Sequence, residues 1–300
     1  MKILIFTLIV LLSYGKEMLI TKEYTEYLKK HVDWEVIEYE DNPLKGWTLE
    51  DAQHLFGKRN VNRRREDIPK AQVIASVPAE INWAGVECDQ GIRNQGPCNA
   101  GWAFAVAGMM SDRCCLHAKN TGWLSPQELI SCDKKSKGCS GGEVDYALDY
   151  VVKSKGLVTE YCFSYESKDK PCPRNCDDGG NWVQAHKCSC PGGIKQCGGL
   201  ASIKSCLTTG PITITFSACK SINYYKIGIY KCDCEPDYIG TLTGLAMGYS
   251  NNPSCNINVK LSLGTAWGNK GYINIDCESC EINDEDNINV MCEKVVKNGF

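Results

Sequence analysis

The sequence predicts an α+β protein whose fold is held together by many disulfide bonds. Three observations lead to this class. Apolar residues recur at helical spacing in several segments that precede Lys153. From Gly210 onward, apolar and hydroxyl residues alternate instead, which is typical of β-strands. The chain also contains 20 cysteines, and all of them lie between Cys88 and Cys292.

Residues 1–15 have the composition of a secretory signal peptide. Met1 and Lys2 precede a mostly apolar run from Ile3 to Leu12, and small residues follow it. The alternative is a membrane anchor, but the run is too short to span a bilayer, and no second long apolar stretch occurs. The dense, even set of cysteines fits an oxidising compartment. We therefore expect no membrane span, and a protein that is secreted or held in the lumen of a lysosome-like or vesicular compartment.

The charge and the cysteine motifs limit the partners and cofactors. A formal net charge of −3 argues against a nucleic-acid partner, which would normally meet a basic face. The motifs Cys188-Ser189-Cys190 and Cys232-Asp233-Cys234 could ligate a metal ion, but oxidised thiols cannot bind zinc as thiolates. We expect no metal site, no cofactor and a monomer.

Residues 16–77 contain no cysteine and many charged side chains. The apolar spacing predicts a helix over Glu23–Val32. Thr48 is a good helix cap, and acidic residues follow it, so a second short helix is predicted, which Gly57 would end. The basic run Lys58–Arg65 comes next. It is either a solvated linker or a processing site.

Further helices and then strands are predicted in the cysteine-rich part. Trp102–Met110 carries apolar residues on one helical face. Ser125–Cys132 begins with a serine cap followed by proline, and Glu143–Lys153 is also helical. Strands are predicted in the ranges 212–217, 242–249 and 259–275. Residues 172–206 form a Cys-, Gly- and Pro-rich insert with few apolar residues, so disulfides are expected to fix its shape.

One segment resembles a known active site. Gln95–Ala105 has the sequence Gln-Gly-Pro-Cys-Asn-Ala-Gly-Trp-Ala-Phe-Ala. It resembles the segment of papain-family cysteine peptidases in which Gln-Gly-x-Cys-x-x-Cys-Trp-Ala-Phe carries the nucleophile. The resemblance extends over residues 42–292, with gaps in the insert, and Ser111–His117 is similar to the cathepsin B branch. It implies a papain-like fold with two lobes, a helical lobe with a central helix and a β-barrel-like lobe.

The resemblance also implies how the chain is divided and cross-linked. Residues 1–15 would be the signal peptide, residues 16–77 a cathepsin B-like propeptide that lies over the cleft until it is removed, and residues 78–300 the peptidase domain. The chain would then be zymogen-like, with its Cys-rich insert at the place of the cathepsin B occluding loop. The implied disulfides are Cys98–Cys139, Cys132–Cys172 and Cys88–Cys115.

The residues at the positions of the family's catalytic groups differ from the family pattern. Gly101 stands for the nucleophilic cysteine, Leu242 for the histidine and Leu261 for the orienting asparagine, whereas Gln95 matches the oxyanion-hole glutamine. No histidine occurs after His186. A pseudo-peptidase that is not an enzyme is therefore predicted. The new leucines either fill the core or form an apolar pocket.

The old cleft is predicted to persist, with Gly141, Gly142 and Trp267 as the residues that contact a ligand. The predicted function is the binding of a peptide or protein through this cleft, and papain-family inhibitors are a further candidate partner. Two alternatives stay open. One is an active hydrolase with a non-standard nucleophile, and the other is a structural Cys-rich surface protein.

Overall fold

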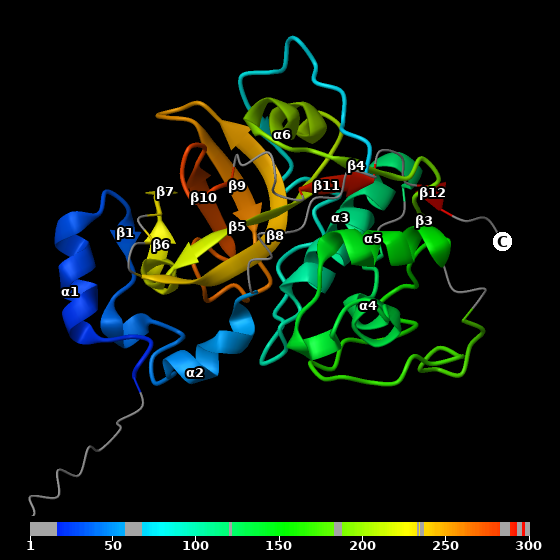
Figure 1. Ribbon diagram of the computed structural model, residues 1–300, viewed down its shortest axis with the longest axis horizontal. Helices are drawn as coiled ribbons and strands as arrows, with labels where there is room; N and C mark the ends of the chain where they lie inside the picture. Colours follow the sequence, from blue (N-terminus) through cyan, green and yellow to red (C-terminus); the bar gives the residue numbers. More distant parts are fainter. Residues whose placement is uncertain are drawn as a thin grey trace, which may run out of the picture.

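Two lobes lie side by side in the computed structural model, one mainly helical and the other built around a β-sheet (Figure 1). The structure describes residues 17–57, 68–119, 122–182, 188–232, 234, 237–282, 289–292 and 296–297. The predicted signal peptide (1–15), the basic run 58–65 and His186 lie outside the described residues. The helices are α1 (Lys22–His31), α2 (Leu49–Ala52), α3 (Gly101–Ala118), α4 (Pro126–Cys132), α5 (Val144–Lys153) and α6 (Leu200–Leu207), with short 3-10 helices η1 (Tyr39–Asp41), η2 (Gln53–Leu55), η3 (Gly138–Ser140) and η4 (Lys220–Tyr224).

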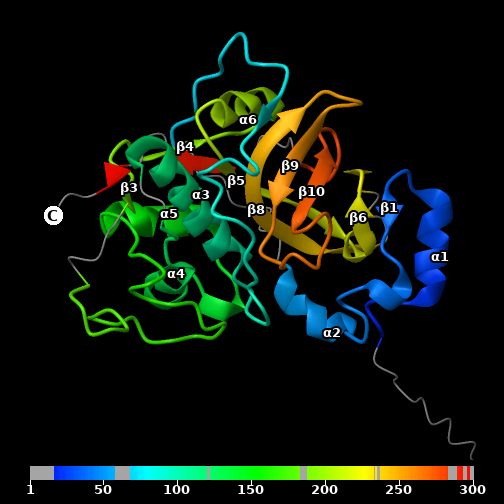
Figure 2. The same ribbon diagram turned by 180° about the vertical axis from the view of Figure 1, so that it is seen from behind.

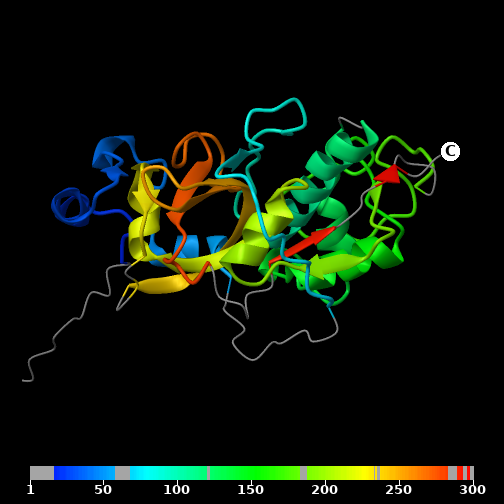
Figure 3. The same ribbon diagram turned by 90° about the horizontal axis from the view of Figure 1, so that it is seen from above.

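The second lobe is built on a curved sheet, the main sheet of the protein, and the remaining strands form two-stranded sheets. The strands are β1 (Glu35–Val36), β2 (Ile81–Asn82), β3 (Cys188–Ser189), β4 (Ile194–Gln196), β5 (Ile212–Cys219), β6 (Tyr225–Ile227), β7 (Ile229–Tyr230), β8 (Tyr238–Ser250), β9 (Asn256–Lys260), β10 (Tyr272–Asp276), β11 (Val290–Cys292) and β12 (Val296–Lys297). The main sheet has the order β2-β8-β9-β10-β7, and β5 pairs with β8. All of its pairs are antiparallel except β10 with β7. Figure 3 shows the strands curling around their own interior, as the predicted barrel-like lobe requires.

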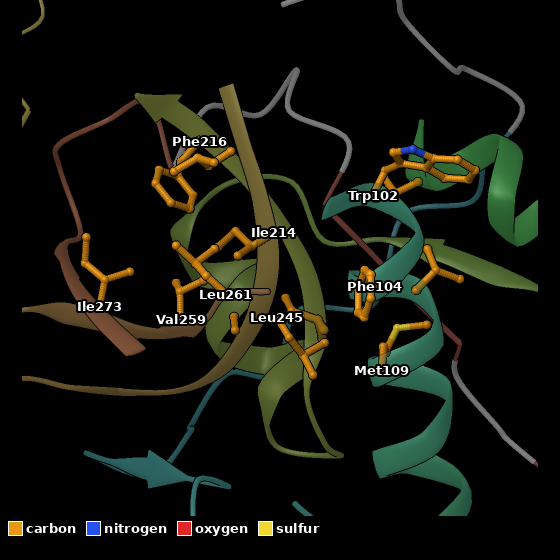
Figure 4. Packing of buried hydrophobic residues seen from close by; sticks show 14 of the residues in the cluster. Trp102, Phe104, Met109, Ile214, Phe216, Leu245, Val259, Leu261 and Ile273 are labelled. Carbon is orange, nitrogen blue, oxygen red and sulfur yellow. The ribbon is translucent and has the colours of Figure 1, made fainter. Parts of the chain in front are cut away.

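Helix α3 forms the wall between the lobes. It contacts α4 and α5 on one side and β5 and β8 on the other. Figure 4 shows Phe104 of α3 on the side of Leu245 in β8, whereas Trp102 lies farther from the sheet. The residues predicted to share an apolar face on this helix are buried, and Ala103 and Ala107 are buried as well, so the helix is packed on more than one face. Each large apolar side chain buried there contributes about 1.5–3 kcal/mol.

Local signals account for the start of helices α4 and α2. The Ser125 hydroxyl accepts a hydrogen bond from the backbone N–H of Glu128, and Pro126 stands at the first helical position of α4, as predicted. Thr48 and Asp51 form a complete capping box at α2. Gly57 does not end a helix, however. The chain leaves η2 after Leu55, and Gly57 pairs instead with a strand of the second lobe.

The N-terminal segment runs along the β-lobe and ends between the lobes. Strand β1 pairs with β6, and Tyr224 ties the chain before α1 to the lobe. Its hydroxyl accepts from the N–H of Thr21 (3.0 Å) and donates to the carbonyl of Leu19 (3.0 Å). Figure 1 and Figure 2 both place α2 below the junction of the two lobes. The residues that follow α2 therefore reach the boundary between the lobes.

All 20 cysteines are paired, in ten disulfides, and none is free. The three pairs implied by the resemblance are present. The other pairs are Cys114–Cys188, Cys162–Cys176, Cys190–Cys292, Cys197–Cys206, Cys219–Cys234, Cys232–Cys280 and Cys255–Cys277. Each disulfide contributes about 2–4 kcal/mol. They cross-link the Cys-rich insert, which also contains the regular elements β3, β4 and α6.

Candidate functional site

A long cleft of about 1660 Å³ lies between the two lobes. Its wall on the helical lobe is formed by Gln95, Asn99, Gly101, Trp102, residues 135–137, residues 139–144 and Tyr146. Its wall on the β-lobe is formed by Thr215, Ser217, Cys232, Cys234, residues 238–243, residues 261–263, Cys280 and Glu281. Residues 53–57, which we call the cleft segment, also line it. The two walls therefore come from distant parts of the sequence and meet only through the packing of α3 against β8.

Helix α3 points its N-terminus at this cleft and begins at Gly101, without a side-chain cap. A Cβ atom at Gly101 would lie 3.2 Å from the carbonyl oxygen of Thr243 and 3.4 Å from Oε1 of Gln95. The position thus faces both strand β8 and the glutamine. A cysteine at such a helix N-terminus would have a lowered thiol pKa. The nearby Cys98 cannot supply this thiol, because it is bonded to Cys139.

The side chain of Gln95 is buried and makes two hydrogen bonds to described residues. Its Nε2 donates to the carbonyl of Cys98 (3.1 Å), and its Oε1 accepts from the hydroxyl of Ser262 (2.7 Å). One N–H of the amide is therefore used inside the loop that precedes α3. A role as an oxyanion donor would require the second N–H.

Leu242 and Leu261 lie in the wall of the β-lobe. Their side chains are only 4% and 3% exposed and belong to the hydrophobic core. Leu242 is paired in register with Phe216, and the Leu261 side chain occupies the space beside Gly244, where a Cβ would meet it at 2.6 Å. This packing favours core filling over an apolar pocket.

The three predicted ligand-contacting residues are not together. Gly141 and Gly142 line the cleft, and a Cβ on Gly142 would lie 2.5 Å from the ring of Trp102, so only glycine fits. Trp267 is 3% exposed and packs on Tyr225, with ring centroids 6.1 Å apart. It does not join the lining of the cleft, because the turn that carries it folds against the interior of the β-lobe.

The cleft holds a segment of its own chain. Gly57 and Thr241 exchange two backbone hydrogen bonds (2.8 and 2.9 Å), and Nδ2 of Asn99 donates to the carbonyl of Phe56 (3.0 Å). The side chains of Leu55 and Phe56 are 6% and 7% exposed. Sequence reasoning missed Asn99 because it stands at a variable position of the active-site motif.

His54 is the ionisable residue of the cleft segment. Burial lowers the pKa of its imidazole, although Asp51 opposes this effect. The ring lies against Trp47, and its Nε2 is buried without a hydrogen-bond partner in the described part of the chain. The neutral ring is therefore the form that suits this position.

Two further groups in the cleft bear on its chemistry. The hydroxyl of Ser217 donates a hydrogen bond to a carboxylate oxygen of Glu281. At the same end of the cleft, the Sγ atoms of Cys219, Cys232 and Cys234 lie within 4.8 Å of one another. These sulfurs belong to disulfides, so they offer no thiolate to a metal ion.

The described helices include none that combines the length and the apolar character needed to cross a bilayer.

Comparison with known proteins gives a consistent result. Residues 77–290 match the sequence model of a family described as papain family cysteine protease. The chain is 30% identical over 239 residues to a cathepsin L-like protein of Caenorhabditis elegans, covering 76% of this chain and 67% of that protein. It is 28% identical over 246 residues to procathepsin L of Rattus norvegicus, covering 79% and 72%. The structure is similar to that of procathepsin B S9 from Trypanosoma congolense, with a TM-score of 0.80, 22% identity and coverage of 93% and 99%, which shows a shared fold.

These matches overturn one prediction. The matching family is described as a family of proteases, and the relatives are named as cathepsins, so the prediction that this chain is not an enzyme is wrong. That prediction depended on the residues at Gly101, Leu242 and Leu261. The residues at these three positions do not decide whether another group in the same cleft acts as a nucleophile, because hydroxyl groups can serve in this role beside a suitable base.

Proposed function

The chain belongs to the papain family of cysteine proteases, and we propose that the cleft between its lobes binds an extended segment of a peptide or protein ligand. One observation carries this proposal. The cleft already accommodates the cleft segment, which it contacts through main-chain hydrogen bonds on one wall and a side-chain amide on the other. Main-chain bonds of this kind give affinity for any extended chain, and the neighbouring pockets give selectivity.

The contacts are strong enough to support binding. Each hydrogen bond contributes about 0.5–1.5 kcal/mol, and burial of a large apolar side chain such as Leu55 or Phe56 contributes about 1.5–3 kcal/mol. A ligand added in solution must compete with the cleft segment, which has the advantage of being tethered. We therefore expect modest affinities for short peptides in the full chain.

Fluorescence anisotropy tests this function. A labelled peptide that copies residues 49–57 is titrated with the full chain, and a peptide of the same composition in scrambled order is the control. We expect saturable binding that unlabelled copies reverse. A papain-family protein inhibitor is the second probe. Absence of binding by both probes at millimolar concentration contradicts the proposal and favours a structural role for this disulfide-rich protein.

Hydrolysis is a second candidate function, and the hydrogen bond from Ser217 to Glu281 is the observation that favours it. A hydroxyl next to a carboxylate is an arrangement in which a nucleophile can be activated. Dipeptidyl fluorogenic substrates should then be turned over by repurified protein across a range of pH. Ser217→Ala should abolish the turnover, and Ser140→Ala, which alters another cleft residue, should retain it. Turnover that is unaffected by Ser217→Ala would rule out this nucleophile.

The division of the chain is part of the same proposal. We propose a signal peptide (1–15), a cathepsin B-like propeptide (16–77) and a peptidase-type domain (78–300), in a monomer that is secreted or held in a lysosome-like or vesicular lumen. The position of the cleft segment between the lobes supports the propeptide assignment. We also propose that Gly101, Leu242 and Leu261 occupy the positions of the family's cysteine, histidine and asparagine. The start of α3 at Gly101, facing β8 and Gln95, supports this correspondence.

A further inference from the structure

We propose that Asn99 is a specificity-determining residue of the cleft, which selects peptides that carry an aromatic residue followed by glycine. This inference extends the proposed function, because it assumes that the cleft binds peptide. It is based on three contacts that the cleft makes with two consecutive residues, Phe56 and Gly57.

The backbone of Asn99 is held by contacts that do not involve the cleft segment. Its N–H donates to the carbonyl of Cys139 (3.0 Å), and its carbonyl accepts from the indole of Trp102 (3.1 Å). The preceding residue is Cys98, whose disulfide to Cys139 closes the loop. The side chain of Asn99 therefore starts from a rigid platform, and a rigid platform reduces the entropy that is lost on binding.

The Asn99 side chain is directed at the cleft segment, which occupies the place of a ligand. Its Nδ2 donates to the carbonyl of Phe56 (3.0 Å), which is the one side-chain hydrogen bond that it makes to a described residue. Gly141 lies beside it, and even a Cβ at that position would stand 3.6 Å from Nδ2. Because the backbone bonds of Asn99 hold the loop, the amide is available to bind the carbonyl of the ligand.

The opposite wall contacts the next residue. The N–H and carbonyl of Thr241 pair with those of Gly57, at 2.9 and 2.8 Å. A Cβ at position 57 would lie 2.9 Å from Oγ1 of Thr241, a distance that real Cβ contacts essentially never show. A side chain at this position would therefore have to displace the hydroxyl of Thr241. A shift of register to avoid this clash would break the hydrogen bond from Asn99 to the preceding carbonyl.

The aromatic residue packs where the wall lacks a side chain. The Cβ of Phe56 lies 2.9 Å from the position that a Cβ of Gly240 would occupy, and the Phe56 side chain is 7% exposed. Gly240 thus leaves room for the Cβ of the residue whose carbonyl Asn99 binds, and the burial of Phe56 in the hydrophobic core shows that a large apolar side chain fits there. The Asn99 amide and the space beside Gly240 accommodate the aromatic residue, and Thr241 accommodates the glycine that follows it.

Hydrogen exchange of the full chain tests the inference within the molecule. Asn99→Ala should speed exchange of the Gly57 amide about 2- to 12-fold, as expected for the loss of one hydrogen bond. Asn99→Asp should speed it further, because a carboxylate would face the carbonyl of Phe56. The control is Ser140→Ala, which changes a cleft residue whose side chain has no hydrogen bond to the cleft segment. Unchanged exchange at Gly57 in Asn99→Ala, or an equal increase throughout α3, would overturn the inference.

A rescue variant tests the glycine requirement. Gly57→Ala should also speed exchange at the Thr241 amide, and the double variant Gly57→Ala with Thr241→Ala should restore protection, because the clashing oxygen is gone. If alanine at position 57 acted only on the cleft segment when it is detached from the cleft, the double variant would not regain protection of the Thr241 amide. Failure of the double variant to recover protection would contradict the steric argument.

Added peptides separate this inference from the proposed function. Excess acetyl-Gln-His-Leu-Phe-Gly-amide should expose the Gly57 amide and leave the Thr241 amide protected, because the peptide replaces the cleft segment. The variants that end in Phe-Leu-amide and Ala-Gly-amide should be at least about tenfold weaker. Equal displacement by all three would overturn the specificity. If none displaces the segment while Asn99→Ala still speeds exchange, the proposed binding of added peptides fails; Asn99 then only positions the chain's own segment, and its role in selecting ligands is overturned.

Discussion

The N-terminal end of helix α3 is surrounded by neutral groups, whereas the part nearer its C-terminus carries buried charged side chains. At its N-terminus, the cleft walls beside Gly101 present neutral groups, among them Gln95 and the buried leucines of the β-lobe. Farther along, Asp112 and the fully buried Arg113 point away from the cleft into the interior. The comparison teaches that the lobes are joined by polar contacts remote from the cleft.

Lys260 and Arg113 are the cations of this interior region. The ammonium of Lys260 lies 2.6 Å from Asp89 and 3.0 Å from Asp112, and the hydroxyl of Tyr272 donates to Asp89 (2.6 Å). These residues come from α3, the loop before it, β9 and β10, so the cluster connects the two lobes. Arg113 has a different environment. In the described residues, its hydrogen-bond partners are backbone carbonyls, a threonine hydroxyl and a methionine sulfur.

The largest effect is expected at Arg113. Its guanidinium donates to the carbonyls of Pro211 (2.7 Å), Gly210 (3.0 Å) and Cys292 (3.1 Å). Arg113→Ala would leave these buried acceptors without donors, and we expect a loss of about 3–5 kcal/mol in the free energy of unfolding. Guanidinium unfolding with intact disulfides measures it. Lys45→Ala, at an exposed ion pair, should stay close to the wild type, and equal stability of the two variants would contradict the comparison.

Leu261 should give the next largest effect. Leu261→Asn places an amide in the core and removes apolar contacts, which is expected to lower the free energy of unfolding by about 2–4 kcal/mol. Leu261→Met preserves the volume and should cost less than about 1.5 kcal/mol. If the asparagine variant were as stable as the methionine variant, position 261 would face the solvent of the cleft instead of the core.

Asp112 should make stability depend on pH. Burial raises the pKa of this carboxyl to about 6, against the opposing effect of Lys260. Between pH of about 4 and 6, the unfolded carboxyl loses its proton before the folded one, so the free energy of unfolding falls as pH rises, by about 2–3 kcal/mol in all. Asp112→Asn removes this contribution. Unfolding curves measured at pH 4, 5 and 6 should show that the free energy of unfolding decreases less in the variant than in the wild type. An identical pH dependence of the two proteins would contradict the raised pKa of Asp112.

Gly101→Cys should have the smallest effect on stability. The neighbours at 3.2 and 3.4 Å leave almost enough room for a Cβ, so the midpoint of unfolding should change little. At the helix N-terminus the pKa of the new thiol should be lowered, and iodoacetamide should modify it at pH 6 about tenfold faster than a free cysteine. A rate like that of free cysteine would show that the helix N-terminus does not act on this position.

Part of the fold follows from local sequence. The serine and proline at 125 and 126 predicted the start of α4, because a cap and a preset backbone angle act on adjacent residues. The cysteine count indicated a cross-linked domain, and the family resemblance implied three of the pairs. The other pairs could not be predicted. Cys190–Cys292, for example, spans 102 residues, and spacing alone does not select one partner among many.

Part of the site followed from the sequence as well. Gly101 and Gly142 were identified by position in the motifs, and both line the cleft. Trp267 was expected there and is buried against Tyr225 instead, because the motif gives its place in the chain and not the direction of its side chain. Asn99 was not identified, since its partner is the carbonyl of Phe56, 43 residues earlier.

The sequence by itself determined the helix caps, the lack of a side chain at Gly101 and the number of cysteines available for cross-links. These features depend on single residues or near neighbours. Only the tertiary structure decided that α3 is packed on more than one face, that Arg113 binds the carbonyls after α6, and that Asn99 meets Phe56. Such contacts join residues far apart in the chain, and they form only when the packing of both lobes brings those residues together.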